Sequence, residues 1–201
     1  MNPDPGLSVA EIASKISVWR VLQPWLLVAL DGRSGAGKST FAKRLAAALG
    51  ASVVAGDDFY RVMDDTERLQ LTPEEGVARY FHWERLAAEV LHPLRAGRPA
   101  SYMRYVWGEN RLDNEACVDP DGVVLVEGVY VARPELVDLF DLVVLVRTDP
   151  LVRRARVESR RENPICWLDR WERAEDWYFA HAFPYDQVWC VANGHTGSQD
   201  L

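Results

Sequence analysis

The sequence contains little cysteine and no long apolar run. Its three cysteines, Cys117, Cys166 and Cys190, are scattered, and their spacing matches no metal-binding motif. Dispersed cysteines in odd number are typical of reduced thiols, which favours a cytoplasmic location over a disulfide framework. No apolar run approaches the about 20 residues that cross a bilayer, and the first residues lack the positive charge of a secretory signal. We therefore expect a cytoplasmic protein without a membrane partner.

Basic residues are outnumbered by acidic ones, and the net charge is −7. Nucleic acids and anionic membranes select basic surfaces, so neither is expected as a partner. Any site for an anion must then be local. The 201 residues suffice for one well-buried domain and are few for two. The chain shows no internal repeat, no low-complexity tract and no linker that would divide it.

A glycine-rich segment carries the clearest motif. The sequence "GRSGAGKST" has the spacing Gly-x4-Gly-Lys-Ser of a phosphate-binding loop. Residues 25–31 precede it as a short apolar strand, and residues 40–49 follow with helical spacing, so both flanks that the motif requires are present. A glycine-rich turn without a ligand would need neither flank. The predicted ATP-binding residues are Gly32, Arg33, Ser34, Gly35, Ala36, Gly37, Lys38, Ser39 and Thr40.

The chemistry of such a loop assigns roles to two of these residues. Backbone N–H groups and the positive end of the following helix surround a polyphosphate. Lys38 is expected to reach the β- and γ-phosphates, and the Ser39 hydroxyl to hold Mg²⁺. We therefore expect ATP and Mg²⁺ as the cofactors of this chain.

Apolar segments alternate with helical ones along the chain, which predicts an α/β fold with a doubly wound, five-stranded parallel sheet. Ligands of such sheets bind at the carboxyl ends of the strands. We expect an N-terminal helix and lead-in at 1–24, one phosphate-loop domain at 25–193 with a short arginine-rich lid at about 150–165, and a flexible tail at 194–201. The expected strands are 25–31, 52–56, 122–128, 141–147 and 186–192, and the expected helices are 9–19, 40–49, 72–97, 134–140, 150–161 and 165–179. The aromatic segment at 100–112 is expected to be extended or loop-like.

Several classes of protein carry a phosphate loop. A GTP-binding switch needs a guanine-reading Asn-Lys-x-Asp element, and the three lysines, Lys15, Lys38 and Lys43, form none. A motor-type ATPase would need an apolar strand ending in Asp-Glu and considerably more chain. A small phosphotransferase remains, which needs Mg²⁺, a carboxylate beside the acceptor hydroxyl and mobile cations over the γ-phosphate.

Three carboxylates follow predicted strands. Asp57 is expected to face the γ-phosphate as the base, and Asp58 to point elsewhere or assist the metal; either could instead cap the next helix. Glu127 ends a run of apolar residues, where a lone carboxylate is costly unless it is paired or bound to a metal. We therefore expect Glu127 in the metal shell together with Ser39.

Arginines are concentrated in one part of the chain. Eight of them fall between Arg147 and Arg173. An arginine-rich helix can be a solvated face, but planar guanidinium groups also suit phosphate oxygens and a transferring phosphoryl group.

From Leu27 to about Ala192 the chain resembles the uridine kinase and phosphoribulokinase group of phosphate-loop kinases. "GDDFYRV" resembles that group's Asp-Ser-Phe-Tyr segment, and "VEGVYV" with "VDLFDLVVLVRTD" resembles its Glu-Gly strand and the strand after it. The resemblance implies that Asp57 is the catalytic aspartate and Glu127 the metal-associated glutamate. It also places Arg153, Arg156 and Arg160 in the lid, with Arg153 on ATP and the other two acting in catalysis.

The resemblance also indicates an acceptor pocket, with departures from the family pattern. "RPASYMRY" is similar to the Pro-x-Tyr acceptor segment, which places Tyr102 and Arg104 near the acceptor, together with Tyr60 and Asp58. Uridine kinases hold the ribose with an aspartate where this chain has His82. Glu84 could substitute for that aspartate, the acceptor could be another metabolite, or His82 could be an ordinary helix-surface residue. Trp107, Gly108 and Glu109 occupy the region of the family's base-reading histidine.

The most specific reading is an ATP- and Mg²⁺-dependent phosphotransferase acting on a hydroxyl of a nucleoside or sugar-like metabolite. Pantothenate or a riboside of nicotinamide are alternative acceptors, and a non-catalytic ATP-binding regulatory module is a different class. A homodimer is left open. Trp167, Trp171 and Tyr178 stand at helical spacing, which favours core packing over a base-stacking platform.

Overall fold

The computed structural model describes residues 6–23, 25–160 and 165–194. The expected tail, apart from residue 194, and positions 161–164 of the expected lid lie outside the described residues. Within the described part of the chain, no helix combines the length and apolar character needed to cross a bilayer.

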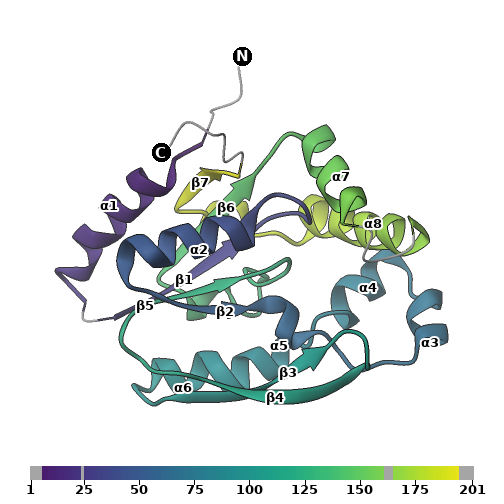
Figure 1. The fold of residues 1–201 in the computed structure, drawn as a ribbon, viewed down its shortest axis with the longest axis horizontal. Helices are drawn as coiled ribbons and strands as arrows, with labels where there is room; N and C mark the ends of the chain where they lie inside the picture. The colour runs from purple at the N-terminus through teal and green to yellow at the C-terminus, as the bar shows by residue number, and fades with distance from the viewer. Residues whose placement is uncertain (1–5, 24, 161–164, 195–201) are drawn as a thin grey trace.

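A five-stranded parallel sheet forms the centre of the molecule (Figure 1). Its spatial order is β2-β5-β1-β6-β7, so the first strand along the chain lies in the middle. Three of the strands are buried along almost their whole length, which is typical of parallel strands covered on both faces. The predicted sheet is therefore confirmed. Its strands are β1 (Trp25–Asp31), β2 (Ser52–Ala55), β5 (Gly122–Glu127), β6 (Leu142–Arg147) and β7 (Cys190–Asn193).

Helices cover both faces of this sheet (Figure 1). On one face, α1 (Val9–Arg20) and α2 (Lys38–Leu49) pack over Leu26, Val28 and Leu30 of β1. A capping box at Ser8 and Glu11 begins α1, and its Ile12 and Ile16 are fully buried, whereas Trp19, three positions after Ile16, is exposed. On the other face, Leu27 and Ala29 of β1 join a larger core with helical residues from 77–94 and 174–179.

The helical region expected at 72–97 is interrupted. Helix α4 (Pro73–Arg79) begins with the predicted cap at Thr72, but the backbone at 80–82 pairs with residues 59–61 through an isolated bridge and two hydrogen bonds of 2.8 Å. Those bonds use backbone groups that a continuous helix would need. The helical elements of this half are α3 (Asp65–Gln70), α4, α5 (Trp83–Leu86), the π-helical segment Ala87–Leu91 and α6 (His92–Arg95). The remaining two helices are α7 (Pro150–Ser159) and α8 (Ile165–His181), and 3₁₀ turns lie at Gly56–Phe59, Val137–Leu139 and Tyr185–Gln187.

A β-hairpin stands apart from the main sheet. β3 (Ala100–Val106) pairs antiparallel with β4 (Arg111–Val118), where a segment that is merely extended or loop-like was expected. The tip is held by Asn110, which adopts a positive φ of 47° and hydrogen-bonds to Met63 and to the Tyr105 hydroxyl. The hairpin therefore lies against the chain that follows β2.

Candidate active site

Three chemistry-bearing segments meet at one edge of the sheet. β5 lies between β1 and β2, and Glu127 at its carboxyl end is in register with Leu30 and Ala55. The phosphate loop leaves β1 at this level, and the turn with Asp57 and Asp58 leaves β2. The parallel register thus brings the predicted loop, base and metal ligand to the same crevice.

The phosphate loop has a backbone that only glycine tolerates at some positions. Gly32, Gly35 and Gly37 all have positive φ, and a Cβ atom on Gly32 or Gly35 would lie within 2.4 Å of a backbone oxygen of Val146 or Arg153. Helix α2 begins at Lys38 directly after the loop. The Lys38 ammonium donates across the loop to the Arg33 carbonyl at 3.2 Å. This is the cradle of N–H groups, helix N-terminus and lysine that suits a polyphosphate.

Glu127 is only 9% exposed and lies beside Ser39 and Lys38. Burial raises the pKa of its carboxyl, while the Lys38 charge and a hydrogen bond with Ser39 act to lower it. Within the described residues, no three His, Cys, Asp or Glu side chains form a protein cage for a metal. Mg²⁺ at phosphate sites takes one or two protein ligands and completes its shell with phosphate oxygens and water, so a Ser39–Glu127 pair fits it.

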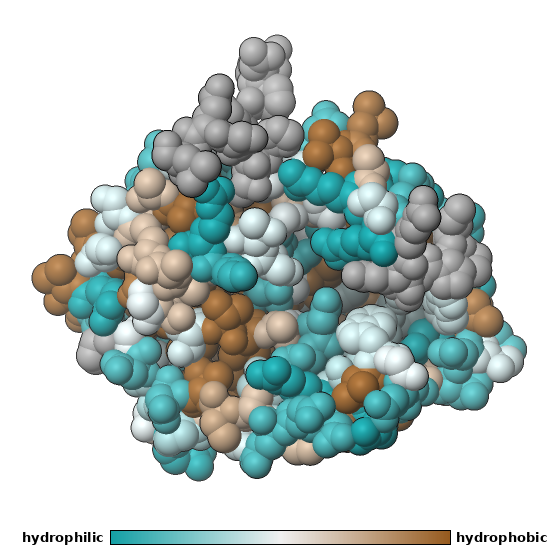
Figure 2. Space-filling model, in the orientation of Figure 1, coloured by the Kyte–Doolittle hydropathy of each residue, from teal (hydrophilic) through white to brown (hydrophobic). Residues whose placement is uncertain are grey.

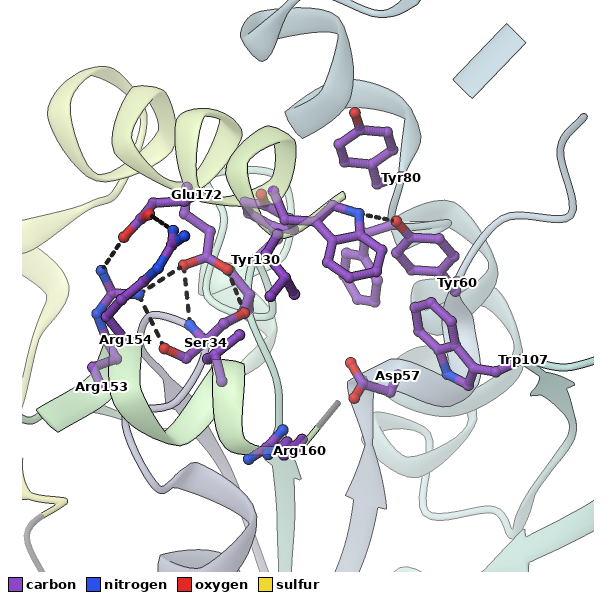
Figure 3. Close-up of a pocket in the computed structure, with 17 residues that line it drawn as sticks. Ser34, Asp57, Tyr60, Tyr80, Trp107, Tyr130, Arg153, Arg154, Arg160 and Glu172 are labelled. Atoms are coloured by element: carbon purple, nitrogen blue, oxygen red, sulfur yellow. Dashed lines mark hydrogen bonds and ion pairs between the residues drawn. The ribbon is translucent and has the colours of Figure 1, made fainter. Parts of the chain in front are cut away.

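The neighbouring carboxylates of Asp57 and Asp58 face different surroundings. Asp57 is exposed and points into a cavity between Arg160 and Trp107 (Figure 3). Asp58 lies 3.7 Å from Nε of Arg104 and accepts a hydrogen bond of 3.4 Å from the Tyr102 hydroxyl. Burial raises the pKa of Asp58, and the Arg104 charge partly offsets this. Three predicted acceptor residues therefore form one cluster next to Asp57.

A cavity of about 580 Å³ opens in front of the phosphate loop. In the orientation of Figure 1, a recess below α7 is visible on the surface (Figure 2). The two walls of this cavity differ in chemistry, as Figure 3 shows. One is aromatic and includes Tyr60, Tyr80, Phe81, Trp107, Tyr130 and Trp171; the other is polar and includes Ser34, Arg153, Arg154, Arg160, Glu172 and Glu175.

The aromatic wall joins three distant parts of the chain. The rings of Tyr60 and Trp107 lie 4.4 Å apart between centroids, and Nε1 of Trp171 donates to the Tyr60 hydroxyl at 2.7 Å. Burial raises the pKa of that hydroxyl, so it stays protonated. Tyr178 is fully buried, as the helical spacing predicted, but Trp171 is only partly buried and lines the cavity. Core packing alone is therefore the wrong interpretation of Trp171.

The arginines of α7 differ in how they are bound. Arg153 is buried and donates to the Ser34 carbonyl and to Glu172, both at 3.0 Å. Arg156 donates to the backbone carbonyls of Gly35 and Gly194. Arg160, directly after α7, lines the cavity, and its guanidinium has no hydrogen bond or ion pair with any residue that the structure describes.

Of the six predicted acceptor residues, Tyr60 lines the cavity, whereas Asp58, Tyr102, Arg104, His82 and Glu84 are not among its lining residues. Glu84 forms an ion pair of 2.9 Å with Arg61, and the His82 backbone N–H donates to the Phe59 carbonyl at the start of α5. Burial, and secondarily the charge of Arg61, lowers the pKa of the His82 imidazole. Neither side chain is among the cavity-lining residues.

Two buried carboxylates of the site were missed. Asp31 ends strand β1, and its oxygens accept from the backbone N–H of Gly32 and Ala132. A carboxylate that ends an apolar run is the same signal that singled out Glu127. Glu175 lies under the loop on α8, at a helical spacing of four from Trp171 and three from Tyr178, and this spacing was the signal available for it.

Comparisons with known proteins agree with this arrangement. The family described as AAA domain matches residues 28–177. A solved structure from Bacillus stearothermophilus, described as a possible uridine kinase, has a TM-score of 0.66 and 19% identity over 91% of this chain and 98% of its own. A candidate fructose transport system kinase from Silicibacter sp. TM1040 has a TM-score of 0.68 and 25% identity over 92% of this chain and 100% of its own. None of the curated proteins compared with the chain matches it significantly. The likeness to phosphate-loop kinases is thereby confirmed for the fold.

Proposed function

Because the chain belongs to the AAA domain family and folds like solved phosphate-loop kinases, we propose that it is an ATP- and Mg²⁺-dependent phosphotransferase acting on a hydroxyl of a small molecule. The observation that supports this most is the cavity itself. An exposed carboxylate, Asp57, faces the same space as the loop residue Ser34 and as Arg160, whose guanidinium has no partner in the described part of the chain. A site that only binds nucleotide does not require a base in that space.

Each residue has a task in this reaction. Asp57 orients the acceptor hydroxyl and accepts its proton as the oxygen bonds to the γ-phosphorus, while the bond from that phosphorus to the leaving ADP breaks. Lys38 and the loop N–H groups hold the phosphates, and the lid cations Arg156 and Arg160 neutralise charge on the moving phosphoryl group. Mg²⁺, held by Ser39 and Glu127, would supply further neutralisation of phosphate oxygens.

The acceptor lies against the cluster of Asp58, Tyr102 and Arg104. Carboxylate, phenol and guanidinium groups together can bind the several hydroxyls of a nucleoside or another sugar-like metabolite. Tyr60 lines the cavity in front of the phosphate loop and contributes apolar surface there. His82 and Glu84, which lie elsewhere, are weaker candidates for acceptor contacts. Pantothenate and a riboside of nicotinamide remain alternative acceptors.

The experiment that tests this function is acceptor-dependent ADP release across a panel of nucleosides, vitamins and sugar alcohols. At least one acceptor should raise ADP release well above the rate with ATP alone. Lys38→Ala should abolish this increase while the thermal melting profile shows a cooperatively folded protein, because the one hydrogen bond that the Lys38 ammonium makes within the described residues is to the Arg33 carbonyl. ATP binding without any acceptor-dependent release would instead indicate a regulatory ATP-binding module.

A further inference from the structure

Helix α8 contacts the phosphate loop and its lead-in strand. The Tyr178 hydroxyl donates to Asp31 at 3.0 Å. One turn earlier, the Glu175 carboxylate accepts from the backbone N–H of Ser34 at 3.0 Å and also from the Ser34 hydroxyl. Residues three apart on a helix share one face, so a single face of α8 reaches both the end of β1 and the loop.

Glu175 is a buried acidic group. It is only 2% exposed, and its second neighbour is Arg153, whose guanidinium lies 3.7 Å away. A buried carboxylate is costly unless it is paired and hydrogen-bonded, and here the partners are a loop amide, a loop hydroxyl and a lid arginine. Arg153 in turn donates to the carbonyl of Ser34. The N–H, hydroxyl and carbonyl of one loop residue are thus all held by α7 and α8.

We propose that Glu175 is a positioning residue that holds the phosphate loop in its nucleotide-binding shape through Ser34 and Arg153. The inference rests on the proposed function only in assuming that the loop binds a nucleotide. Glu175 lines the cavity on the loop side, yet it carries the charge that repels phosphate. A direct contact between this carboxylate and an anion would be unfavourable. The hydrogen bonds to Ser34 and the ion pair with Arg153 therefore explain why a glutamate stands at this position.

A positioning role and a purely electrostatic role predict opposite changes in nucleotide affinity for the variant Glu175→Gln. If Glu175 acted only through its charge, then Glu175→Gln would remove a repulsive carboxylate and tighten nucleotide binding. If it positions the loop, the same change loses charge-assisted hydrogen bonds and lets Ser34 and Arg153 move. Such bonds are worth enough to weaken binding by roughly tenfold or more.

Calorimetric binding of a non-hydrolysable ATP analogue with Mg²⁺, measured well below the melting temperature, tests the proposal. Glu175→Gln should raise the Kd about tenfold or more, and the matched control Glu74→Gln, at an exposed carboxylate of α4, should leave it unchanged. A Kd for Glu175→Gln that is unchanged or lower would overturn the proposal. A role confined to stability would lower the melting temperature without changing the Kd.

A second variant covers the case in which Glu175→Gln does not fold. Ser34→Ala removes the hydroxyl that Glu175 holds and leaves the loop backbone in place. It should also raise the Kd, and the double variant should bind no more weakly than Glu175→Gln alone, because both changes break one interaction. Additive losses, or no loss in Ser34→Ala, would contradict the role of this pair. Because binding is measured without an acceptor, a failure to find an acceptor would refute the proposed function and not this inference.

Discussion

Asp57 and Asp58 are adjacent in sequence but differ in what they face. Asp57 is exposed to the cavity, whereas Asp58 contacts Tyr102 and Arg104. Asp57→Asn keeps the size of the side chain and removes the charge, so kcat should fall by roughly 10² to 10⁴ with little change in ATP affinity. Asp58→Asn should chiefly raise the acceptor KM. Steady-state kinetics on both variants decide which aspartate is the base. A larger loss of kcat in Asp58→Asn than in Asp57→Asn would assign the base to Asp58.

Asp31 provides a test that depends on pH. Burial raises the pKa of its carboxyl to about 6, against hydrogen bonds from Ala132 and Gly32 and the charge of Lys38, all of which lower it. The folded protein then holds a proton that the unfolded chain releases near the ordinary pKa of 3.8. The contribution of Asp31 to the free energy of unfolding is therefore greatest below about pH 4 and is lost as the pH rises through 6, by roughly 3 kcal/mol.

Chemical denaturation at several pH values measures this contribution. The difference in free energy of unfolding between the unaltered protein and Asp31→Asn should change between pH 4 and pH 6 and become constant above pH 7. A difference that is independent of pH would show that Asp31 is ionised throughout this range.

At the scale of the elements, the arginines on and directly after α7 differ in whether their guanidinium groups already have partners. The Arg153 guanidinium is already paired, whereas the guanidinium of Arg160 has no partner among the described residues and faces Asp57 across the cavity. Cations that act on charge developing in the transition state affect kcat more than ground-state binding. Arg160→Ala should lower kcat by roughly tenfold or more and change ATP affinity little, while Arg98→Ala on the surface serves as the control. An unchanged kcat in Arg160→Ala would show that Arg160 is a solvated surface residue without a role in phosphate transfer.

The β3–β4 hairpin supplies a test of the acceptor side. Trp107 at its tip packs on Tyr60 and lines the cavity. Trp107→Ala removes apolar contact surface from the acceptor without touching the phosphate loop. The acceptor KM should rise severalfold with kcat nearly unchanged, as measured with the best acceptor from the panel. A fall in kcat at constant KM would place Trp107 in the reaction instead.

The elements also show where prediction from sequence succeeds and fails. Strands β1, β5 and β6 are continuous apolar runs bounded by polar residues, so their existence could be predicted. The hairpin could not, because a register shift at Met103 and Arg104 breaks the alternation of β3, and β4 is mostly exposed and polar. The interruption of the helical region at 80–82 could not be predicted either, because it depends on pairing with residues 59–61 and not on the local sequence.

For the molecule as a whole, the parallel sheet explains why so much of the site could be predicted. Carboxyl ends of adjacent parallel strands share one edge, so motifs at the ends of β1, β2 and β5 had to meet. The contribution of α8 could not be predicted in this way. Glu175 reaches Ser34 across 141 positions of sequence, and nothing local to either residue indicates that contact.

The central claim is that this chain transfers phosphate to an acceptor hydroxyl with Asp57 as the base. The most direct test is mass-spectrometric detection of phosphorylated product from the acceptor panel, with the unaltered protein and Asp57→Asn compared at matched nucleotide occupancy. We expect a product that contains one added phosphate and forms at least about 10² times more slowly with the variant. No product from any acceptor despite bound ATP, or equal rates for the two proteins, would contradict it.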